Sequence, residues 1–408
     1  MKKTTVRLCV LSLLMVLQIP LAISQKCETV AWNQFRGGNR TGISPEKVTL
    51  DRFSKKSPKL LWKKKIGDGF SEIVVSGDKL YTMVSERTDS TSGSEFIAAF
   101  EVKTGNEIWR TKVDSMFFDD FGDGPRSTPA IGEDKIYSLS SYGKLTANSL
   151  KDGKTIWQVD FMAEFESRIP RWAFCTSPVL VDGILVMEVG GTKSRAFVGF
   201  DKDNGKVLWA TGKGIATFSS PVVAEIEGKT NIVFVNQNSI YSLNSQGDTL
   251  WTHNSGIGAP TAMPVVFDSN KIFISNVHYS AFSVVEVKNS KAKEILHGAT
   301  MKNDYSTCVY HDGCIYGFNV AALQCISATT GEKKWAKRGF GKGSLIMVGD
   351  DLLVLSDKGK LIQVKATPDA YTELGSIQAI SGKSWTAPSY SGGKLYVRNL
   401  TEMACYAL

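Results

Sequence analysis

Tryptophan recurs along this chain with a nearly constant period, and that period constrains the fold more than any other feature. Six tryptophans stand 42 to 52 residues apart, with one interval doubled, and five of them follow a glycine by four residues. The tryptophans are Trp62, Trp109, Trp157, Trp209, Trp251 and Trp335, and the glycines are Gly105, Gly153, Gly205, Gly247 and Gly331. A period of this length, built of short strands joined by glycine turns, is typical of a β-propeller or a similar repeat array.

Each repeat contains the signals for four short strands. In the second repeat, the segments 126–131, 135–139, 144–147 and 154–158 alternate with residues that favour hairpin turns. Four antiparallel strands in about 45 residues make one propeller blade. Because segments that match the second strand occur eight times along the chain, the sequence predicts eight blades.

The two ends of the chain complete one blade between them. The last repeat provides only three strands before Leu408, and residues 59–63 form a strand that has no blade of its own. Pairing these ends removes the open sheet edges that favour aggregation. We therefore predict an all-β fold, an eight-bladed β-propeller of four-stranded antiparallel blades whose ring is closed by the N-terminal strand.

The repeated tryptophans have a structural role in this prediction. At the end of an outer strand, an indole ring can lie against the neighbouring blade and donate its N–H to a backbone carbonyl there. Blades five and seven end without the tryptophan, at residues 294–296 and 373–375. We assign the six tryptophans to docking between blades rather than to a binding site.

The first residues have the pattern of a targeting segment. Residues 1–24 show the basic start, the apolar stretch and the small-residue end of a secretory signal peptide. We expect a lead-in segment at 25–58 and one propeller domain at 59–408, in a protein that is periplasmic or secreted after cleavage. No later stretch reaches the roughly 20 apolar residues of a membrane-spanning helix, so no transmembrane segment is expected. Lys26 before Cys27 argues against a lipid-attachment signal.

Charge and cysteine usage exclude several classes of function. The net charge of +8 is spread without a basic block, which argues against a nucleic-acid partner. Six cysteines follow the signal, and no two are adjacent or form a Cys-x-x-Cys pair, so we expect buried thiols in the β core. The histidines fall in separate blades or loops, which makes a zinc site or a catalytic triad improbable; they are His253, His278, His297 and His311.

Several phrases of the repeat resemble the tryptophan-docking repeat of the pyrroloquinoline-quinone-like (PQQ-like) β-propellers. These phrases are 99–109, 147–157 and 325–335, together with 32–42 near the mature N-terminus. For quinoprotein dehydrogenases, the resemblance implies PQQ and calcium at the channel mouth, beside a tryptophan and two adjacent disulfide-bonded cysteines, with an aspartate as base. For BamB-like members, it implies a ring without cofactor that holds a partner protein of outer-membrane assembly. This chain has no adjacent cysteine pair, and it lacks the lipid signal of the BamB-like scaffolds.

One mouth of the predicted channel is the candidate site. Inner strands of a propeller begin around the channel, so equivalent positions form a ring, and most members of this ring are aromatic or cationic. Two long loops, 109–129 and 157–178, approach the same mouth, and long loops on a rigid scaffold commonly carry binding residues. The predicted site residues are Phe70, Arg126, Trp172, Phe218, Tyr305, Lys342 and Trp385.

We hypothesise that this mouth binds a small anionic or aromatic ligand, or an extended loop of a partner. Arg126 and Lys342 would act as charge partners, and Trp172 and Trp385 as stacking surfaces. In the alternative interpretation, these side chains only fill the channel and pair with one another. The next positions inward are mostly small hydroxyl residues, as expected where eight backbones crowd an axis.

No catalytic or metal-binding residue is assigned. The segment 119–124 resembles a calcium loop, but Phe121 stands where a liganding side chain is required and no glutamate follows. The sequence therefore favours an exported, monomeric, non-catalytic module for binding or scaffolding in the cell envelope. It would use no cofactor and would hold an envelope protein or a small ligand at the channel mouth.

Two alternatives stay open. The chain would be a PQQ-dependent quinoprotein dehydrogenase that oxidises an alcohol or sugar if PQQ and calcium bound near Arg126, Lys342 and Trp385. It would be a carbohydrate- or polyol-binding ring if sugars stabilised the fold.

Overall fold

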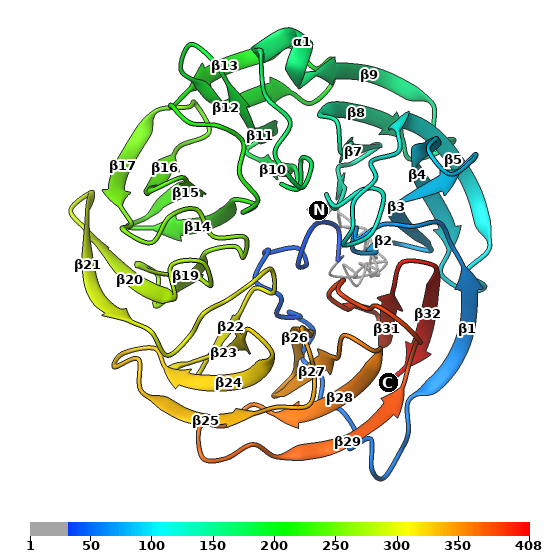
Figure 1. Ribbon diagram of the computed structural model, residues 1–408, viewed down its shortest axis with the longest axis vertical. Helices are drawn as coiled ribbons and strands as arrows, with labels where there is room; N and C mark the ends of the chain where they lie inside the picture. The colour runs from blue at the N-terminus through cyan, green and yellow to red at the C-terminus, as the bar shows by residue number, and fades with distance from the viewer. Residues whose placement is uncertain (1–31) are drawn as a thin grey trace, which may run out of the picture.

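Eight four-stranded sheets form a ring around a central channel (Figure 1). This computed structural model describes residues 32–408, so the predicted signal peptide at 1–24 and Cys27 lie outside the described residues. In every blade the first strand lies at the channel and the last at the rim, and neighbouring strands are antiparallel. The ring confirms the predicted eight-bladed propeller.

The first four blades run from the channel outward in chain order. Blade one contains β2 (Val74–Ser76), β3 (Lys79–Arg87), β4 (Gly93–Glu101) and β5 (Glu107–Ser115). Blade two contains β6 (Ala130–Ile131), β7 (Lys135–Leu139), β8 (Lys144–Ser149) and β9 (Thr155–Asp160). Blade three contains β10 (Val179–Val181), β11 (Ile184–Gly191), β12 (Arg195–Asp201) and β13 (Val207–Thr211). Blade four contains β14 (Val222–Ile226), β15 (Lys229–Asn236), β16 (Ser239–Leu243) and β17 (Thr249–Asn254).

Blades five to seven repeat this order, and blade eight combines both ends of the chain. Blade five contains β18 (Val265–Phe267), β19 (Lys271–Asn276), β20 (Ala281–Lys288) and β21 (Lys291–Gly298). Blade six contains β22 (Val309–His311), β23 (Cys314–Asn319), β24 (Ala322–Ser327) and β25 (Lys333–Lys337). Blade seven contains β26 (Ser344–Val348), β27 (Asp351–Leu355), β28 (Lys360–Lys365) and β29 (Glu373–Gln378). Blade eight contains β30 (Ser389–Ser391), β31 (Lys394–Arg398), β32 (Glu402–Ala407) and β1 (Lys59–Lys65).

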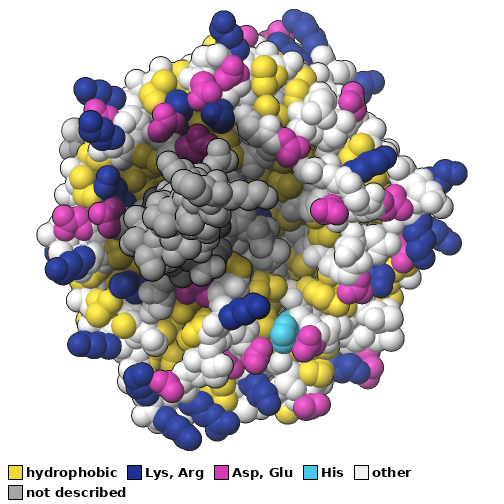
Figure 2. Space-filling model, turned by 180° about the vertical axis from the view of Figure 1, so that it is seen from behind, with side chains coloured by type: hydrophobic (Ala, Val, Ile, Leu, Met, Phe, Trp, Pro, Cys, Tyr) yellow, Lys and Arg dark blue, Asp and Glu magenta, His cyan; other side chains and the backbone are white. Residues whose placement is uncertain are grey.

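The N-terminal strand closes the ring as predicted. β1 pairs antiparallel with β32, so that Trp62 stands opposite Cys405, and the blue and red strands lie side by side in Figure 1. The helix α1 (Phe161–Phe165) interrupts the long loop between blades two and three. Asp160 caps it by accepting hydrogen bonds from the N–H groups of Met162 and Ala163. On the face shown in Figure 2, Lys and Arg side chains are interspersed with Asp and Glu.

An indole from one blade rests on a glycine of the next blade. A Cβ atom at Gly105 would lie only 2.6 Å from the ring of Trp62, and at Gly205 only 2.7 Å from that of Trp157. Gly153 against Trp109 and Gly247 against Trp209 repeat the arrangement. All four glycines have positive φ, between 68° and 85°, so glycine is required both for the turn and for the contact.

Four of the indoles also donate a hydrogen bond to a carbonyl of the next blade, as predicted. The pairs are Trp62 with Val102 (2.9 Å), Trp157 with Lys202 (3.1 Å), Trp209 with Ser245 (2.8 Å) and Trp335 with Thr367 (2.7 Å). The prediction is wrong for Trp251, whose N–H donates to the Asn231 side chain of its own blade at 2.9 Å. The buried N–H of Trp109 has no acceptor among residues 32–408.

In the two blades that lack the tryptophan, a phenylalanine makes a contact in its place. In blade five, Leu296 occupies the tryptophan position opposite Val284, and Phe282 meets Gly331 of blade six instead, with 2.6 Å from ring to Cβ position. In blade seven, Gly375 occupies that position, and Phe53 of the lead-in segment lies against it. The Phe53 N–H donates to the Gln363 side chain at 2.8 Å. The lost contacts are therefore replaced from other parts of the chain.

Small residues and cysteines lie beneath the indoles. Cys325 of β24 stands opposite both Tyr316 and Trp335, the position that Ala147 occupies opposite Trp157. The five cysteines of the described chain have no disulfide partner there, and four of them are buried; they are Cys175, Cys308, Cys314, Cys325 and Cys405. Buried thiols in the β core were expected.

Residues 32–44, the crossing segment, run across the channel and bond to inner strands on both sides (Figure 1). The N–H groups of Val75 and Ile131 donate to the carbonyls of Trp32 and Asn33, each at 2.8 Å. On blade seven, the N–H of Met347 donates to the Gly42 carbonyl at 2.8 Å. Residues 32–44, which the sequence analysis assigned to a lead-in segment, therefore lie on the axis of the propeller and form part of it.

Three fully buried arginines hold this axis and the final seam. Arg40 donates to the carbonyls of Ser177, Pro178 and Pro221 in blades three and four. Arg36 donates to the carbonyls of Cys308 and Leu345 at the bases of blades six and seven. Arg398 of blade eight reaches the carbonyls of Gly67, Ser71 and Met83, which ties blade eight to blade one. Burial lowers the pKa of Arg40 and of Arg398 to about 9.

Two buried glutamates cross blade boundaries. Glu188 of blade three accepts hydrogen bonds from Thr217 and Asn236 of blade four, from the Thr217 N–H at 2.9 Å and from the Asn236 amide at 2.6 Å. Glu95 of blade one accepts from the Ser141 N–H of blade two at 2.9 Å. Burial raises the pKa of both carboxyl groups to about 7.

The indole contact predicts different costs for two glycine substitutions. Gly205→Ala should lower the free energy of unfolding by about 2–4 kcal/mol, because the new Cβ adds overlap with Trp157 to the strain of positive φ. Gly228→Ala, at φ +70° with no atom within 4 Å of its Cβ position, should cost about 1 kcal/mol. Urea unfolding of both variants measures the difference, and equal costs would contradict the docking role.

The pKa of Glu188 predicts that part of the stability is lost as pH rises. The Glu188 carboxyl group has a pKa of about 7 in the folded protein and about 4.3 in the unfolded chain. Its full contribution to the free energy of unfolding is therefore present below pH ~4.3. Its contribution falls as pH rises through 7, by about 2 kcal/mol between pH 5.5 and pH 8. Chemical unfolding at both pH values should show a smaller decrease for Glu188→Gln than for the unchanged protein. An identical decrease would contradict the assignment.

Candidate functional site

All seven predicted site residues line one cavity at the channel, which we call the aromatic cavity. Its volume is about 250 Å³, and its walls come from the start of the inner strands and the loops that lead into them. Each of the seven side chains is half-buried, so each contributes both to packing and to the accessible wall; they are Phe70, Arg126, Trp172, Phe218, Tyr305, Lys342 and Trp385.

Aromatic rings from several blades contact one another around the cavity. Trp385 of blade eight stacks on Phe70 of blade one, with ring centroids 6.1 Å apart and planes at 25°. It also lies 5.3 Å from the ring of Tyr305. Trp172 lies 5.0 Å from Phe218 on the other side. These contacts form two groups of aromatic side chains in the wall of the cavity.

Phe121 completes this wall, and the sequence analysis did not assign it to the site. Its ring lies between those of Trp385 and Trp172, at 6.2 Å and 6.4 Å, and is 49% exposed. The Lys383 ammonium group donates to the Phe121 carbonyl at 2.8 Å and so ties this loop to blade eight. The sequence signal that could have identified it is an aromatic residue on the long loop 109–129, which approaches the predicted mouth.

The cations of the site already have partners. Lys342 pairs with Asp304 at 2.6 Å. Arg126 donates to the carbonyls of Gly122 and Gly124 at 3.0 and 2.8 Å, and its guanidinium lies 3.6 Å from Asp119. Part of the predicted set therefore pairs with its neighbours, as the channel-filling interpretation supposed. A direct role for Arg126 and Lys342 toward a ligand stays a prediction.

The floor of the aromatic cavity is charged and buried. Glu72 accepts a hydrogen bond from the backbone N–H of Arg36 at 2.9 Å. Burial raises the pKa of the Glu72 carboxyl to about 7, although Arg36 and Arg40 oppose the shift. Burial also lowers the pKa of Arg36. Of the two arginines, only Arg36 lines this cavity, so its floor holds one cation beside one carboxyl group.

Hydroxyl groups link neighbouring blades just below the aromatic side chains of the cavity wall. The N–H of Glu72 donates to the Thr128 hydroxyl at 2.9 Å, and the N–H of Thr128 to the Ser177 hydroxyl at 3.0 Å. The N–H of Ser177 continues the chain to Ser220 at 2.9 Å. These bonds hold successive inner strands at one height, which positions the side chains of the cavity wall.

Among residues 32–408, the site holds no activated cysteine and no cluster of metal ligands. Burial raises the pKa of the Cys175 thiol to about 12, so it stays protonated and weakly nucleophilic. In the segment 119–124, Asp119 accepts from the Phe121 N–H at 2.8 Å and Asp123 forms an ion pair with Arg87. Within residues 32–408, no three His, Cys, Asp or Glu side chains come together as metal ligands.

These residues do not fit the PQQ and calcium site that the resemblance implies for dehydrogenases. The chain contains no adjacent cysteines. Three carboxyl groups line the cavity: Asp119 and Asp304 lie against Arg126 and Lys342, and the buried Glu72 accepts from the backbone N–H of Arg36. A calcium ion requires several free oxygen ligands, and this donor set does not supply them.

Comparison with known proteins agrees with the fold. Residues 93–337 match the family described as outer membrane protein assembly factor BamB. The structure of BamB from Moraxella catarrhalis is similar with a TM-score of 0.62 and 12% identity, over 86% of this chain and 100% of that chain. No curated protein sequence matches the chain.

Alcohol dehydrogenases share the same architecture. Quinohemoprotein alcohol dehydrogenase from Comamonas testosteroni has a TM-score of 0.69 and 12% identity, over 94% of this chain and 81% of that chain. The alcohol dehydrogenase ADHIIG from Pseudomonas putida HK5 has the same TM-score and 14% identity, over 93% and 80%. At such identities the likeness shows the fold alone. No helix formed by residues 32–408 has the length and apolar character needed to cross a membrane.

Proposed function

The chain belongs to the family of the outer membrane protein assembly factor BamB, and on that premise we propose that it is an exported, non-catalytic propeller. It serves as a binding or scaffolding module in the cell envelope. Its recognition site is the aromatic cavity, and its occupant is an apolar or aromatic side chain on an extended loop of an envelope protein. Export follows from the predicted signal peptide at residues 1–24.

The observation that carries this proposal is the aromatic wall. Trp172, Trp385 and Phe121 come from three separate parts of the ring and expose apolar faces around one cavity of about 250 Å³. Aromatic side chains in a preformed pocket are the usual energetic centre of a protein interface. Because contacts with one another and the bond from Lys383 to the Phe121 loop restrain these rings, little conformational entropy is lost on binding.

The charges around the cavity support recognition rather than chemistry. Each cation has a partner, and the thiol of Cys175 is protonated at neutral pH. Such a site can exclude wrong partners through its charges while the aromatic faces supply the affinity.

Capture of partners from envelope extracts tests this proposal. We expect Phe121→Ala combined with Trp385→Ala to reduce capture at least tenfold, because two of the three apolar faces are removed. Tyr279→Ala is the matched control, since Tyr279 is an aromatic residue outside the cavity and 55% exposed. Thermal unfolding of each variant separates lost binding from lost folding. Unchanged capture by the folded double variant would remove the cavity from consideration.

The dehydrogenase alternative makes a separate prediction. Purified protein supplied with PQQ and calcium should reduce no artificial electron-acceptor dye with alcohols or sugars, because the cysteine pair and the free carboxylates are missing. A quinoprotein dehydrogenase of known activity serves as the positive control. Robust turnover by this chain would falsify the non-catalytic assignment.

A further inference from the structure

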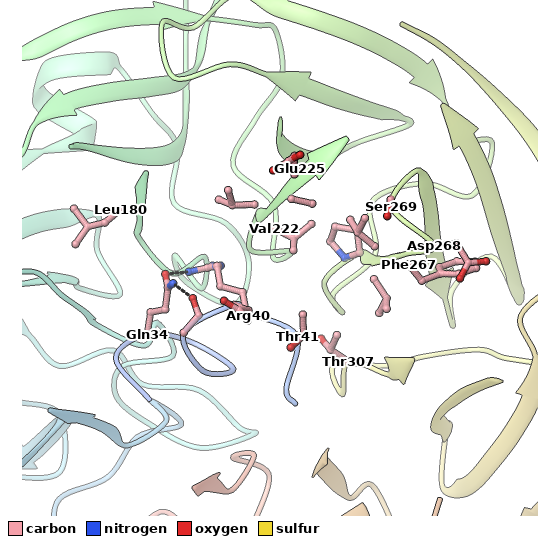
Figure 3. A pocket seen from close by; sticks show the side chains of 17 residues that line it. Gln34, Arg40, Thr41, Leu180, Val222, Glu225, Phe267, Asp268, Ser269 and Thr307 are labelled. Atoms are coloured by element: carbon pink, nitrogen blue, oxygen red, sulfur yellow. Dashed lines mark hydrogen bonds between the residues drawn. The ribbon is translucent and has the colours of Figure 1, made fainter. Parts of the chain in front are cut away.

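A second cavity lies between the crossing segment and the inner strands of blades three to five, and we call it the edge cavity. Its volume is about 490 Å³. Figure 3 shows Gln34, Arg40 and Thr41 of the crossing segment on one side and Val222 and Glu225 of β14 on the other. The proposed function above does not use this cavity.

The backbone of β14 presents its free edge to the edge cavity. In an antiparallel strand, alternate residues direct their N–H and C=O groups to the partner strand, and those between them direct these groups away. Ile226 pairs with Lys229 across a two-residue turn, so Glu225 and Val223 direct their backbone groups toward the channel. Leu180 has the same place in β10, one residue before the turn-closing pair of Val181 with Ile184.

The crossing segment uses this same position on other blades. Val75 and Met347 each precede the residue that closes their hairpin, Ser76 and Val348, and both donate to the crossing segment. Ile43 also forms a parallel bridge with Met347. An extended chain therefore already binds the inner edges of blades one, two and seven. The equivalent edges of blades three and four face the edge cavity instead.

The side chains around the edge cavity define the chemistry of an occupant. Val223 and Val266 supply apolar walls on neighbouring blades. Glu225 is exposed at the opening and has no ion pair or side-chain hydrogen bond within residues 32–408. The other carboxylate there, Asp268, is held by Lys271 at 3.0 Å and by the Tyr310 hydroxyl at 2.7 Å. One acidic group is thus available to a cation.

We propose that the edge cavity binds a short extended segment of a partner protein as an added strand on the inner edge of β14. The backbone groups of Val223 and Glu225 pair with the segment, its apolar side chains lie between blades four and five, and a lysine or arginine pairs with Glu225. Main-chain bonds supply affinity in this mode, and the alternate side chains supply specificity.

Binding of synthetic peptides to the processed, full-length protein tests the proposal. The probe is acetyl-Val-Lys-Val-Thr-Val-amide, and its control carries N-methyl groups on alternate amides, which removes backbone donors and keeps the side chains. We expect calorimetric binding of the probe, at least tenfold weaker binding of the methylated control, and slower hydrogen exchange in residues 222–226 when the probe is bound. No binding of the probe, or equal binding of the two peptides, would overturn the proposal.

Substitutions on the protein test the charge contact. Glu225→Lys should weaken binding of the probe about tenfold and strengthen binding of the analogue with glutamate in place of lysine. Glu133→Lys makes the same charge change at an exposed turn outside the cavity and should leave both affinities unchanged. Because both substituted residues are exposed, both variants should fold. Self-association that is lost in Glu225→Lys would show a second copy of the chain as occupant and would overturn the assignment to a partner.

Discussion

The contact between an indole ring and a backbone glycine is the constraint on which the ring depends. At Gly105, Gly153, Gly205 and Gly247 the turn needs positive φ, and the ring of the preceding blade leaves no room for a Cβ atom. Blades eight, one, two and three, which carry these indoles, are therefore incomplete until the next blade covers the indole. Each of these contacts joins one repeat to the next. The regular spacing of tryptophans in the sequence therefore corresponds to the regular spacing of sheets around the axis.

The axis depends on a different set of contacts. Backbone carbonyls of blades three, four, six and seven converge on the guanidinium groups of Arg36 and Arg40. Both side chains are buried. Carbonyl dipoles and the charge of the Glu72 carboxyl group compensate their positive charges, and neither arginine forms a direct ion pair within residues 32–408. The crossing segment also divides the channel into two environments. The aromatic cavity is lined by rings and hydroxyl groups, and the edge cavity is lined by strand edges.

Much of the fold and part of the site could be predicted from the sequence, because both follow from positions that repeat. The repeated strand pattern predicted the eight blades, and the count of strands at the two ends of the chain predicted the closure by residues 59–63. Equivalent inner-strand positions brought Phe70, Phe218 and Trp385 to one cavity. The features that the sequence did not predict are contacts that occur only once among the described residues and follow no repeated position. Phe53 replaces a tryptophan from outside the repeat, and Asp304 pairs with Lys342 across a blade boundary that no local pattern marks.

The crossing segment also sets the order in which the molecule can be completed. Arg36 bonds to the carbonyl of Leu345, 309 positions further along the chain, and β1 pairs with β32 at the other terminus. Contacts of such sequence separation close slowly, since the entropy of a long loop is lost before any bond forms. Arg36 and β1 thus reach these native partners only after residues 345 and 402–407 have been synthesised. The propeller becomes a ring only after its final blade has been synthesised, because β1 pairs with β32.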